Sequence, residues 1–258
     1  MREREPESDT EQTEKQKSRR RKRLAILAVS AILFATPVGW LAFYRQAESP
    51  LDALEKQGSS IQTEVMGPAW FRRFADKWKL PVPRRIVLFS SKTATDKDLA
   101  ILAEERSLRV IFLEGSPVTD AGLAHLREHP NIWQVFIKDM RITDAGVRHL
   151  GQLPQLRALW LRGTEVTDAG LVHLKGLKYL SNFGLADTGI TDNGLGILSS
   201  FSSLRHIELD GTQVTDESLK HLYEMKQLIG VSLKGTRVTP EGIARLKAAI
   251  PGLWVRTD

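Results

Sequence analysis

The chain has 258 residues, of which 41% are apolar and 26% are charged, and it contains no cysteine. It therefore has no disulfide framework, no thiolate metal site and no cysteine nucleophile. Nine basic and six acidic residues in 1–23 contribute +3 to the net charge of +6, and the remaining 28 basic and 25 acidic residues contribute the other +3. Both signs are interleaved in this larger part, so we expect no nucleic-acid partner.

Residues 1–23 are polar and end in five consecutive basic residues, which predicts a disordered basic tail. Residues 24–44 are uncharged and mainly apolar. A helix of this length measures about 31 Å, enough to cross a hydrocarbon core of about 30 Å. The preceding basic cluster predicts a single-pass transmembrane helix with a cytoplasmic N-terminus. The rest of the chain is then extracytoplasmic, anchored to the cytoplasmic membrane.

A cleavable signal peptide is the alternative for this segment, with Leu24 to Ala35 as its apolar core. The apolar character continues past Ala35 through Val38, Trp40 and Phe43. This length favours a segment that stays attached to the protein.

Residues 45–83 lack the repeat described below, and we interpret them as an N-terminal cap and linker. A helix is expected to end near Gly58, and a short strand is expected from Ile61 to Met66. A second helix follows, and one of its stripes carries Trp70, Phe74 and Trp78. Such a stripe occurs in ligand sites, but here it favours a cap over the apolar interior of the first repeat.

A six-residue signature, VTDAGL at 118–123, returns through the rest of the chain in one unbroken register. Its aspartates are spaced by 24 residues: Asp96, Asp120, Asp144, Asp168, Asp192 and Asp216. A fixed period in this range predicts a solenoid, in which each unit buries its apolar face against its neighbours. We therefore expect residues 84–258 to form an α/β repeat domain of about seven units.

A second pattern, LxxLxLxxT, precedes each signature and is clearest at residues 156–164. Its last two leucines alternate with period two, which predicts a short strand with both side chains in the core. The signature then predicts a turn and a short helix. Thr167 or Asp168 is expected to supply the N-cap oxygen of that helix. The recurrent aspartate therefore has a structural role, and we predict no catalytic or metal series from it.

Together, LxxLxLxxT and VTDAGL resemble the leucine-rich-repeat family in its strand-plus-helix, ribonuclease-inhibitor-like form. They are particularly similar to membrane-anchored bacterial proteins built from VTDAGL units. The resemblance implies a curved solenoid with a parallel sheet on the concave side and helices on the convex side. It also implies protein binding without catalysis or a cofactor. The chain departs from the family's asparagine ladder by placing threonine at 164, 188, 212 and 236.

The repeat register predicts which strand residues point out of the concave face. The central column begins with Leu88, Phe112, Phe136 and Trp160, and Lys138 and Arg162 stand in the charged column beside it. An apolar aromatic centre with a charged border is typical of an interaction surface. We therefore predict that these six residues contact a partner protein. The alternatives are that the aromatics only stack on one another, or that part of this chain covers them.

Three further features have less functional weight. His125, His149, His173 and His221 recur on the helices, but no carboxylate shares their column, so we expect no metal site.

His206, Glu208 and Asp210 form a polar cluster on the concave strands, where a hydrolase-type general base is the enzymatic alternative. An architectural scaffold without a discrete ligand is the other alternative. At the far end, we expect residues 253–255 to begin an eighth strand, with Trp254 shielding the last core layer.

Overall fold

The computed structural model describes residues 54–56, 58–65, 84–127 and 129–258. Most of them belong to one compact unit, Ser49–Glu64 with Arg84–Asp258. The predicted tail, the predicted transmembrane segment and the predicted helix with Trp70, Phe74 and Trp78 lie outside the described residues. Within the described ranges, no helix has the length and apolar character needed to span a bilayer.

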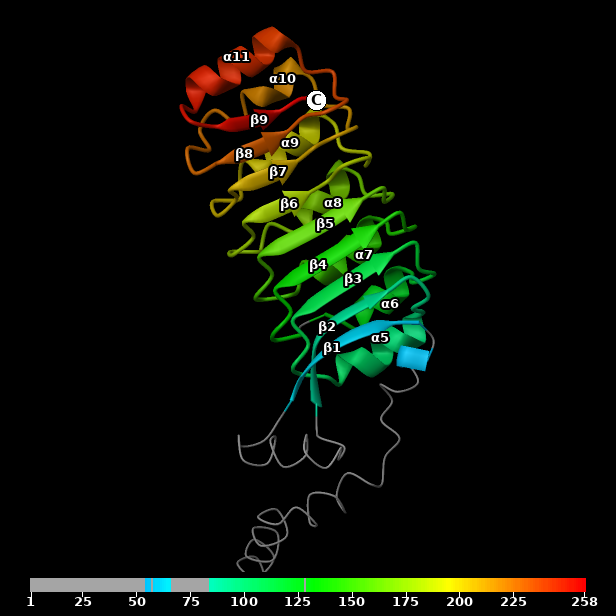
Figure 1. The fold of residues 1–258 in the computed structure, drawn as a ribbon. Coiled ribbons are helices and arrows are strands. Elements are labelled where there is room, and N and C mark those ends of the chain that lie inside the picture. The colour runs from blue at the N-terminus through cyan, green and yellow to red at the C-terminus, as the bar shows by residue number, and fades with distance from the viewer. Residues whose placement is uncertain (1–53, 57, 66–83, 128) are drawn as a thin grey trace, which may run out of the picture. The chain divides into compact units, whose positions relative to one another are not determined.

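The strands of this unit form one nine-stranded sheet whose spatial order follows the chain (Figure 1). Every pair from β2 to β9 is parallel. The strands are β1 (Ser60–Val65), β2 (Arg84–Ser91), β3 (Val110–Glu114), β4 (Gln134–Lys138), β5 (Ala158–Arg162), β6 (Asn182–Gly184), β7 (His206–Glu208), β8 (Gly230–Ser232) and β9 (Trp254–Arg256). Sequential parallel neighbours require a crossover between each pair, and a helix follows each strand from β2 to β8.

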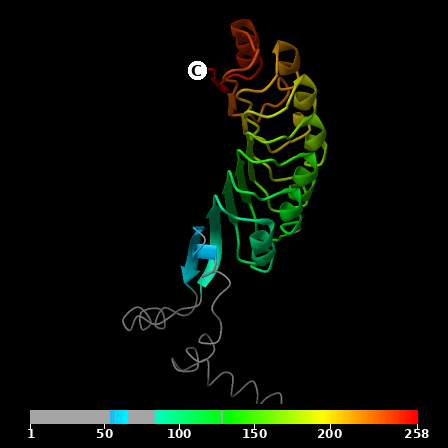
Figure 2. The ribbon, with the colours of Figure 1, turned by 90° about the vertical axis from the view of Figure 1, so that its right-hand side faces the viewer.

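The helices all lie on one side of the sheet, and the array bends so that the sheet lines its inner, concave side (Figure 2). They are α5 (Asp96–Ala103), α6 (Asp120–Ala124), α7 (Asp144–Leu150), α8 (Asp168–Val172), α9 (Asp192–Leu198), α10 (Asp216–Leu219) and α11 (Pro240–Ala249). A helix is wider than the spacing between strands, so side-by-side stacking of the two layers bends the array toward the sheet.

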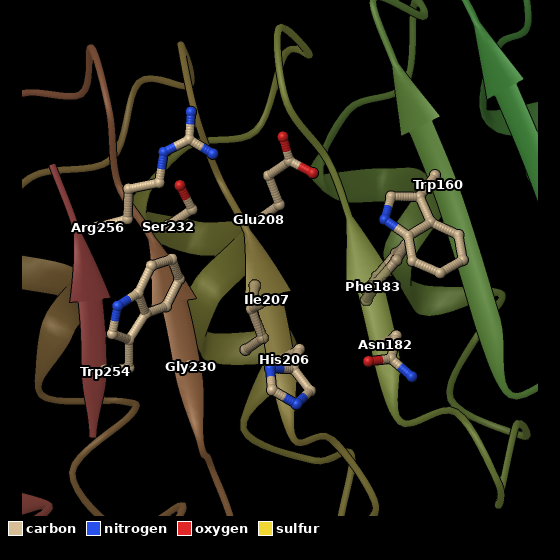
Figure 3. A pocket seen from close by; sticks show the side chains of 10 residues that line it. All are labelled: Trp160, Asn182, Phe183, His206, Ile207, Glu208, Gly230, Ser232, Trp254 and Arg256. Carbon is tan, nitrogen blue, oxygen red and sulfur yellow. The ribbon is translucent and has the colours of Figure 1, made fainter. Parts of the chain in front are cut away.

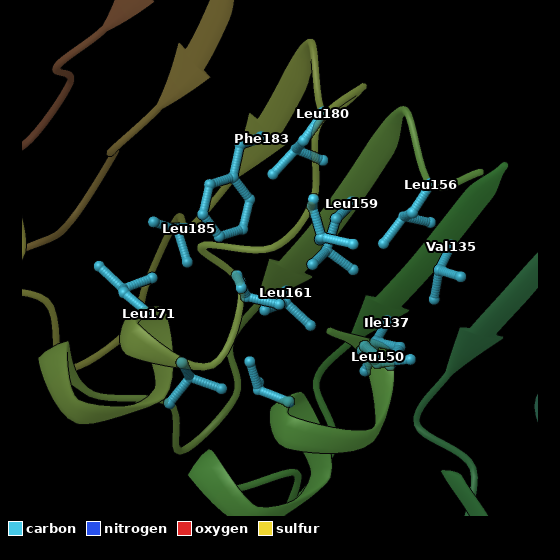
Figure 4. Close-up of a cluster of buried hydrophobic side chains, with 14 of the residues drawn as sticks. Val135, Ile137, Leu150, Leu156, Leu159, Leu161, Leu171, Leu180, Phe183 and Leu185 are labelled. Carbon is cyan, nitrogen blue, oxygen red and sulfur yellow. The ribbon is translucent and has the colours of Figure 1, made fainter. Parts of the chain in front are cut away.

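The core lies between the sheet and the helices and consists of the residues that the repeat pattern predicts (Figure 4). Leu159 and Leu161 from β5 and Leu171 from α8 belong to this one cluster, and all three side chains are fully buried. Burial of one such side chain contributes about 1.5–3 kcal/mol to folding. The layer recurs in every repeat, so each unit depends on its neighbours for its apolar contacts.

Threonine, rather than the aspartate that follows it, caps each helix from α6 onward. The side chain of Thr167, for example, accepts a hydrogen bond from the amide of Ala169. The same role belongs to Thr119, Thr143, Thr191, Thr215 and Thr239. Of the two N-cap oxygens that the sequence left open, the structure therefore selects the threonine hydroxyl.

The recurrent aspartate instead connects neighbouring repeats. The two carboxylate oxygens of Asp144 accept hydrogen bonds from the amide and the hydroxyl of Thr167, at 2.8 and 2.6 Å. The equivalent pairs are Asp96–Thr119, Asp120–Thr143, Asp168–Thr191, Asp192–Thr215 and Asp216–Thr239. Each threonine thus donates two hydrogen bonds to the aspartate of the preceding repeat and caps the helix of its own repeat. These bonds join the repeats through a continuous polar row.

The glycine of the signature makes room for this row. A Cβ at Gly170 would collide with Oδ1 of Asp144, and the same collision recurs at the equivalent glycines. Ser218 is the exception: its hydroxyl donates to the carbonyl oxygen of Thr215 at 2.9 Å and also lies beside Asp192. Burial raises the pKa of Asp192, but the hydrogen bonds from Ser218 and Thr215 outweigh this effect and hold the pKa below its ordinary value.

The turns after β5, β6, β7 and β8 are each closed by the threonine that replaces the family's asparagine. Thr164 Oγ1 donates to the carbonyl oxygen of Leu161 at 2.7 Å, and Thr188, Thr212 and Thr236 make the equivalent bond. At the N-terminal end of the sheet, Leu54 is buried in the core. Strand β1 (Ser60–Val65) lies within one residue of the strand predicted from Ile61 to Met66.

Candidate concave-face interface

Phe112, Phe136 and Trp160 form one continuous ring stack on the concave face. The ring centroids of Phe112 and Phe136 are 4.2 Å apart, and those of Phe136 and Trp160 are 4.0 Å apart, with interplanar angles of 9° and 7°. The three residues are direct partners across β3, β4 and β5. Parallel strands are about 4.8 Å apart, so rings that stand in one register position are forced face to face. All three rings are partly exposed.

The position of Leu88 differs from the prediction. Leu88 pairs with Val110, and Ser90 is the residue beside Phe112. Five positions separate Ser91 from Asp96 at the start of α5, whereas seven separate its partner Leu113 from Asp120. This shorter turn moves β2 by two residues. Leu88 therefore lies on the predicted face but one column away from the ring stack, which begins at Phe112.

Lys138 and Arg162 border the stack as predicted, but both are paired with acids. Lys138 Nζ lies 2.6 Å from Glu114, which also contacts Lys92 at 3.0 Å. Hydrogen bonds from Lys138 and Lys92 lower the pKa of Glu114 from 4.5 to about 2. Arg162 lies 3.1 Å from Asp187. A pocket of about 300 Å³ lies between this border and the rings of Phe112 and Phe136.

A second pocket, of about 200 Å³, opens at the other end of the stack (Figure 3). Trp160 stands on one side and Trp254 on the other, with Asn182, His206, Glu208, Ser232 and Arg256 between them. The prediction that Trp254 shields the core is wrong. β9 pairs in register with β8, which turns Trp254 onto the concave face, where it is 59% exposed. Leu253 and Ile250 are the buried residues at this end.

Two glycines shape this second pocket. A Cβ at Gly184 would collide with the indole of Trp160, so the absence of a side chain allows that indole to lie over β6. A Cβ at Gly230 would lie 3.1 Å from Nδ1 of His206 and 3.2 Å from Cε3 of Trp254. Gly184 is the direct partner of Trp160 across β5 and β6, and the side-chain direction of the tryptophan brings the indole over it.

The polar cluster of the enzymatic alternative does not assemble as a unit. Asp210 is 8% exposed, and its Oδ1 accepts hydrogen bonds from the Ser232 hydroxyl at 2.5 Å and from the Lys234 amide at 2.9 Å. Among the described residues, His206 and Glu208 make no hydrogen bond to each other or to Asp210. Burial, followed by the nearby charge of Asp210, raises the pKa of Glu208 above its ordinary value.

The histidines on the helix side stay apart. His125 and His173 are exposed, whereas His149 and His221 are half-buried. Within the described ranges, no three histidine or acidic side chains are close enough together to hold a metal ion. Nδ1 of His149 is buried without a hydrogen-bond partner in the described part of the chain.

Comparison with solved structures places this arrangement among known folds. An internalin (inlF) from Listeria monocytogenes matches 61% of this chain with a TM-score of 0.50 and 21% sequence identity. The chain is a leucine-rich-repeat solenoid. It spans 43% of that internalin, so the likeness concerns the leucine-rich-repeat fold alone. Internalin C2 from the same organism is 22% identical over 67% of this chain and 81% of its own, with a TM-score of 0.46. No family model matches the sequence, and no curated protein does.

Proposed function

We propose that this protein is a membrane-tethered leucine-rich-repeat module that binds another protein through its concave face and has no catalytic activity. The stack of Phe112, Phe136 and Trp160 carries this proposal. Three aromatic rings lie in contact, stay partly exposed and have a charged border, which is the composition of an interface core and its rim. Leu88 extends the apolar surface beside Val110.

Exposure distinguishes these rings from ordinary core aromatics. Phe183, on the helix-facing side of β6, is fully buried and packs against Phe201. The stacked rings instead project from the opposite side of the sheet, where each presents part of its surface to solvent. Rigid aromatic side chains that are already in contact lose little conformational entropy when a partner covers them, which favours binding.

The binding test is a triple variant, Phe112→Ser, Phe136→Ser and Trp160→Ser, used with the full chain to capture partners from detergent-solubilised membranes. Tyr179→Ser is the matched control, because Tyr179 is 51% exposed and lies outside the strands. We expect one specific partner to be lost with the triple variant and retained with the control. Unchanged recovery would instead favour the architectural scaffold.

A stability measurement must accompany this test, because the rings also contact each other. Each stacked pair contributes about 0.5–1.5 kcal/mol beyond its buried area. We expect the triple variant to keep its far-ultraviolet circular dichroism and to melt at a moderately lower temperature. Collapse of the fold would show that the rings act as core residues and would contradict a contact role.

Membrane tethering is supported by the apolar segment 24–44 and the basic cluster before it. A C-terminal alkaline phosphatase fusion is expected to be active, because that enzyme requires the extracytoplasmic side, while a C-terminal green fluorescent protein fusion is expected to be dark. An N-terminal epitope tag should remain on the full-length band. Loss of the tag would show cleavage and support the signal-peptide alternative.

A further inference from the structure

The pocket between Trp160 and Trp254 contains one carboxylate, that of Glu208, which has no direct partner in the described part of the chain. Glu208 projects into this pocket from β7 (Figure 3) and is partly buried. No hydrogen bond or ion pair to its carboxylate occurs among the described residues. A carboxylate withdrawn from water without a partner is unfavourable, and a cation placed beside it would relieve that cost.

The two arginines whose charges act on Glu208, Arg162 and Arg256, each pair with another acid. Arg162 lies 3.1 Å from Asp187. Nη2 of Arg256 lies 4.0 Å from Asp210, and its Nε donates to the carbonyl oxygen of Asp258 at 3.2 Å. Each of these two arginines therefore has an acidic neighbour. Arg162 and Arg256 therefore act on Glu208 only from a distance, Asp210 opposes them, and the carboxylate of Glu208 has room for a cation at direct contact.

The aromatic walls suit the same kind of ligand. Trp254 is 59% exposed, and the indole of Trp160 lies over Gly184 beside the pocket. Indole faces attract cations, most strongly where a nearby carboxylate is partly desolvated. The volume of about 200 Å³ is smaller than the 300–1,000 Å³ or so that drug-sized ligands occupy. A pocket of this volume suits a single amino-acid side chain.

We propose that this pocket receives one lysine or arginine side chain of a protein partner, with Glu208 as its counter-ion and Trp160 and Trp254 as its walls. This assignment rests on the proposed binding function, because the side chain belongs to the partner. It adds an acidic position to a surface whose centre is apolar and whose border carries Lys138 and Arg162. The pocket selects the partner by charge, while the ring stack supplies apolar contact area.

A displayed library of seven-residue peptides, selected on the full chain in detergent micelles, tests the assignment. We expect the wild type to enrich peptides that contain Lys or Arg. Glu208→Gln and Trp254→Ala are each expected to lower capture of those peptides by about tenfold, the effect of one lost charged or cation–π contact. Glu208→Gln keeps the shape of the side chain, and Trp254 is mostly exposed, so both variants should fold.

Phe112→Ser serves as the comparison, because it alters the ring stack without lining this pocket. Capture that depends on Phe112 but is unchanged by Glu208→Gln would overturn the cation pocket and leave the proposed function standing. Enrichment of peptides without a basic residue would likewise overturn the cation pocket and leave the proposed function standing. If the wild type selects no peptide and also captures no partner from membranes, both proposals are overturned.

Discussion

Asp168 accepts two hydrogen bonds from Thr191 of the next repeat, one from its amide at 2.9 Å and one from its hydroxyl at 2.5 Å. Thr191 in turn caps α9 by accepting a bond from the amide of Asn193. The aspartate and the threonine of VTDAGL therefore act across the boundary between two units. In a solenoid, such boundary contacts determine whether the repeats unfold together.

Replacement of this aspartate should weaken the boundary. Asp168→Ala removes both acceptors and leaves the amide and the hydroxyl of Thr191 without that partner. We expect a loss of about 1–3 kcal/mol in the free energy of unfolding, the usual effect of lost charge-assisted hydrogen bonds at a partly exposed site. Urea unfolding followed by circular dichroism measures it. Glu165→Ala, at an exposed position, is expected to stay within about 0.5 kcal/mol of wild type, and an equal loss in both variants would contradict the boundary role.

The glycine of the signature gives a second test. A Cβ at Gly170 would collide with the carboxylate of Asp144, so Gly170→Ala is expected to destabilise the fold by about 1–3 kcal/mol through displacement of that bond. A methyl group at Gly176 would meet no other atom within 4 Å, and the φ of this glycine is not in the left-handed region. Gly176→Ala should therefore be neutral or stabilise by up to about 1 kcal/mol. Thermal melts should show a lower melting temperature for Gly170→Ala and an unchanged or higher one for Gly176→Ala.

The tryptophan at the end of the ring stack depends on a different glycine. Gly184→Ala places a methyl group against the indole of Trp160 and should tilt it away from Phe136. We expect a reduced near-ultraviolet circular dichroism signal and altered tryptophan fluorescence. Gly196→Ala is the control, because its nearest neighbour is His221 at 3.7 Å, an ordinary contact distance. A normal aromatic spectrum in Gly184→Ala would show that the stack does not need this gap.

The ion pairs at the border of the stack predict an unusual titration. Hydrogen bonds from Lys138 and Lys92 lower the pKa of Glu114 to about 2. Because the folded-state pKa is depressed, the stabilising contribution of Glu114 is present above its ordinary pKa of 4.5 and is lost as the pH falls through about 2. Carboxyl-carbon NMR at low salt should show this midpoint. Lys138→Met should raise it, and added salt should weaken the effect at this exposed site.

Much of the solenoid was predictable because the same local sequence pattern determines the strand, turn and helix of each repeat. The alternation in LxxLxL determines which face of the strand is buried, and the spacing of 24 residues sets the order of strands from β3 to β8. The columns through Phe112, Phe136 and Trp160 follow directly, since parallel strands of one length and register bring equivalent residues side by side. Stacking of these rings needed no information beyond the repeat.

Other features required the tertiary structure, because they depend on geometry between units. The turn after β2 is two residues shorter, closed by hydrogen bonds from the amides of Thr93 and Ala94 to the Ser91 hydroxyl, and this moves Leu88 out of the ring column. The pocket beside Trp160 depends on side-chain directions over Gly184 and Gly230. Periodicity along the sequence determined the strands and the core. Only the packing of neighbouring repeats decided which oxygens accept hydrogen bonds across each boundary, and placed Trp254 on the concave face rather than in the core.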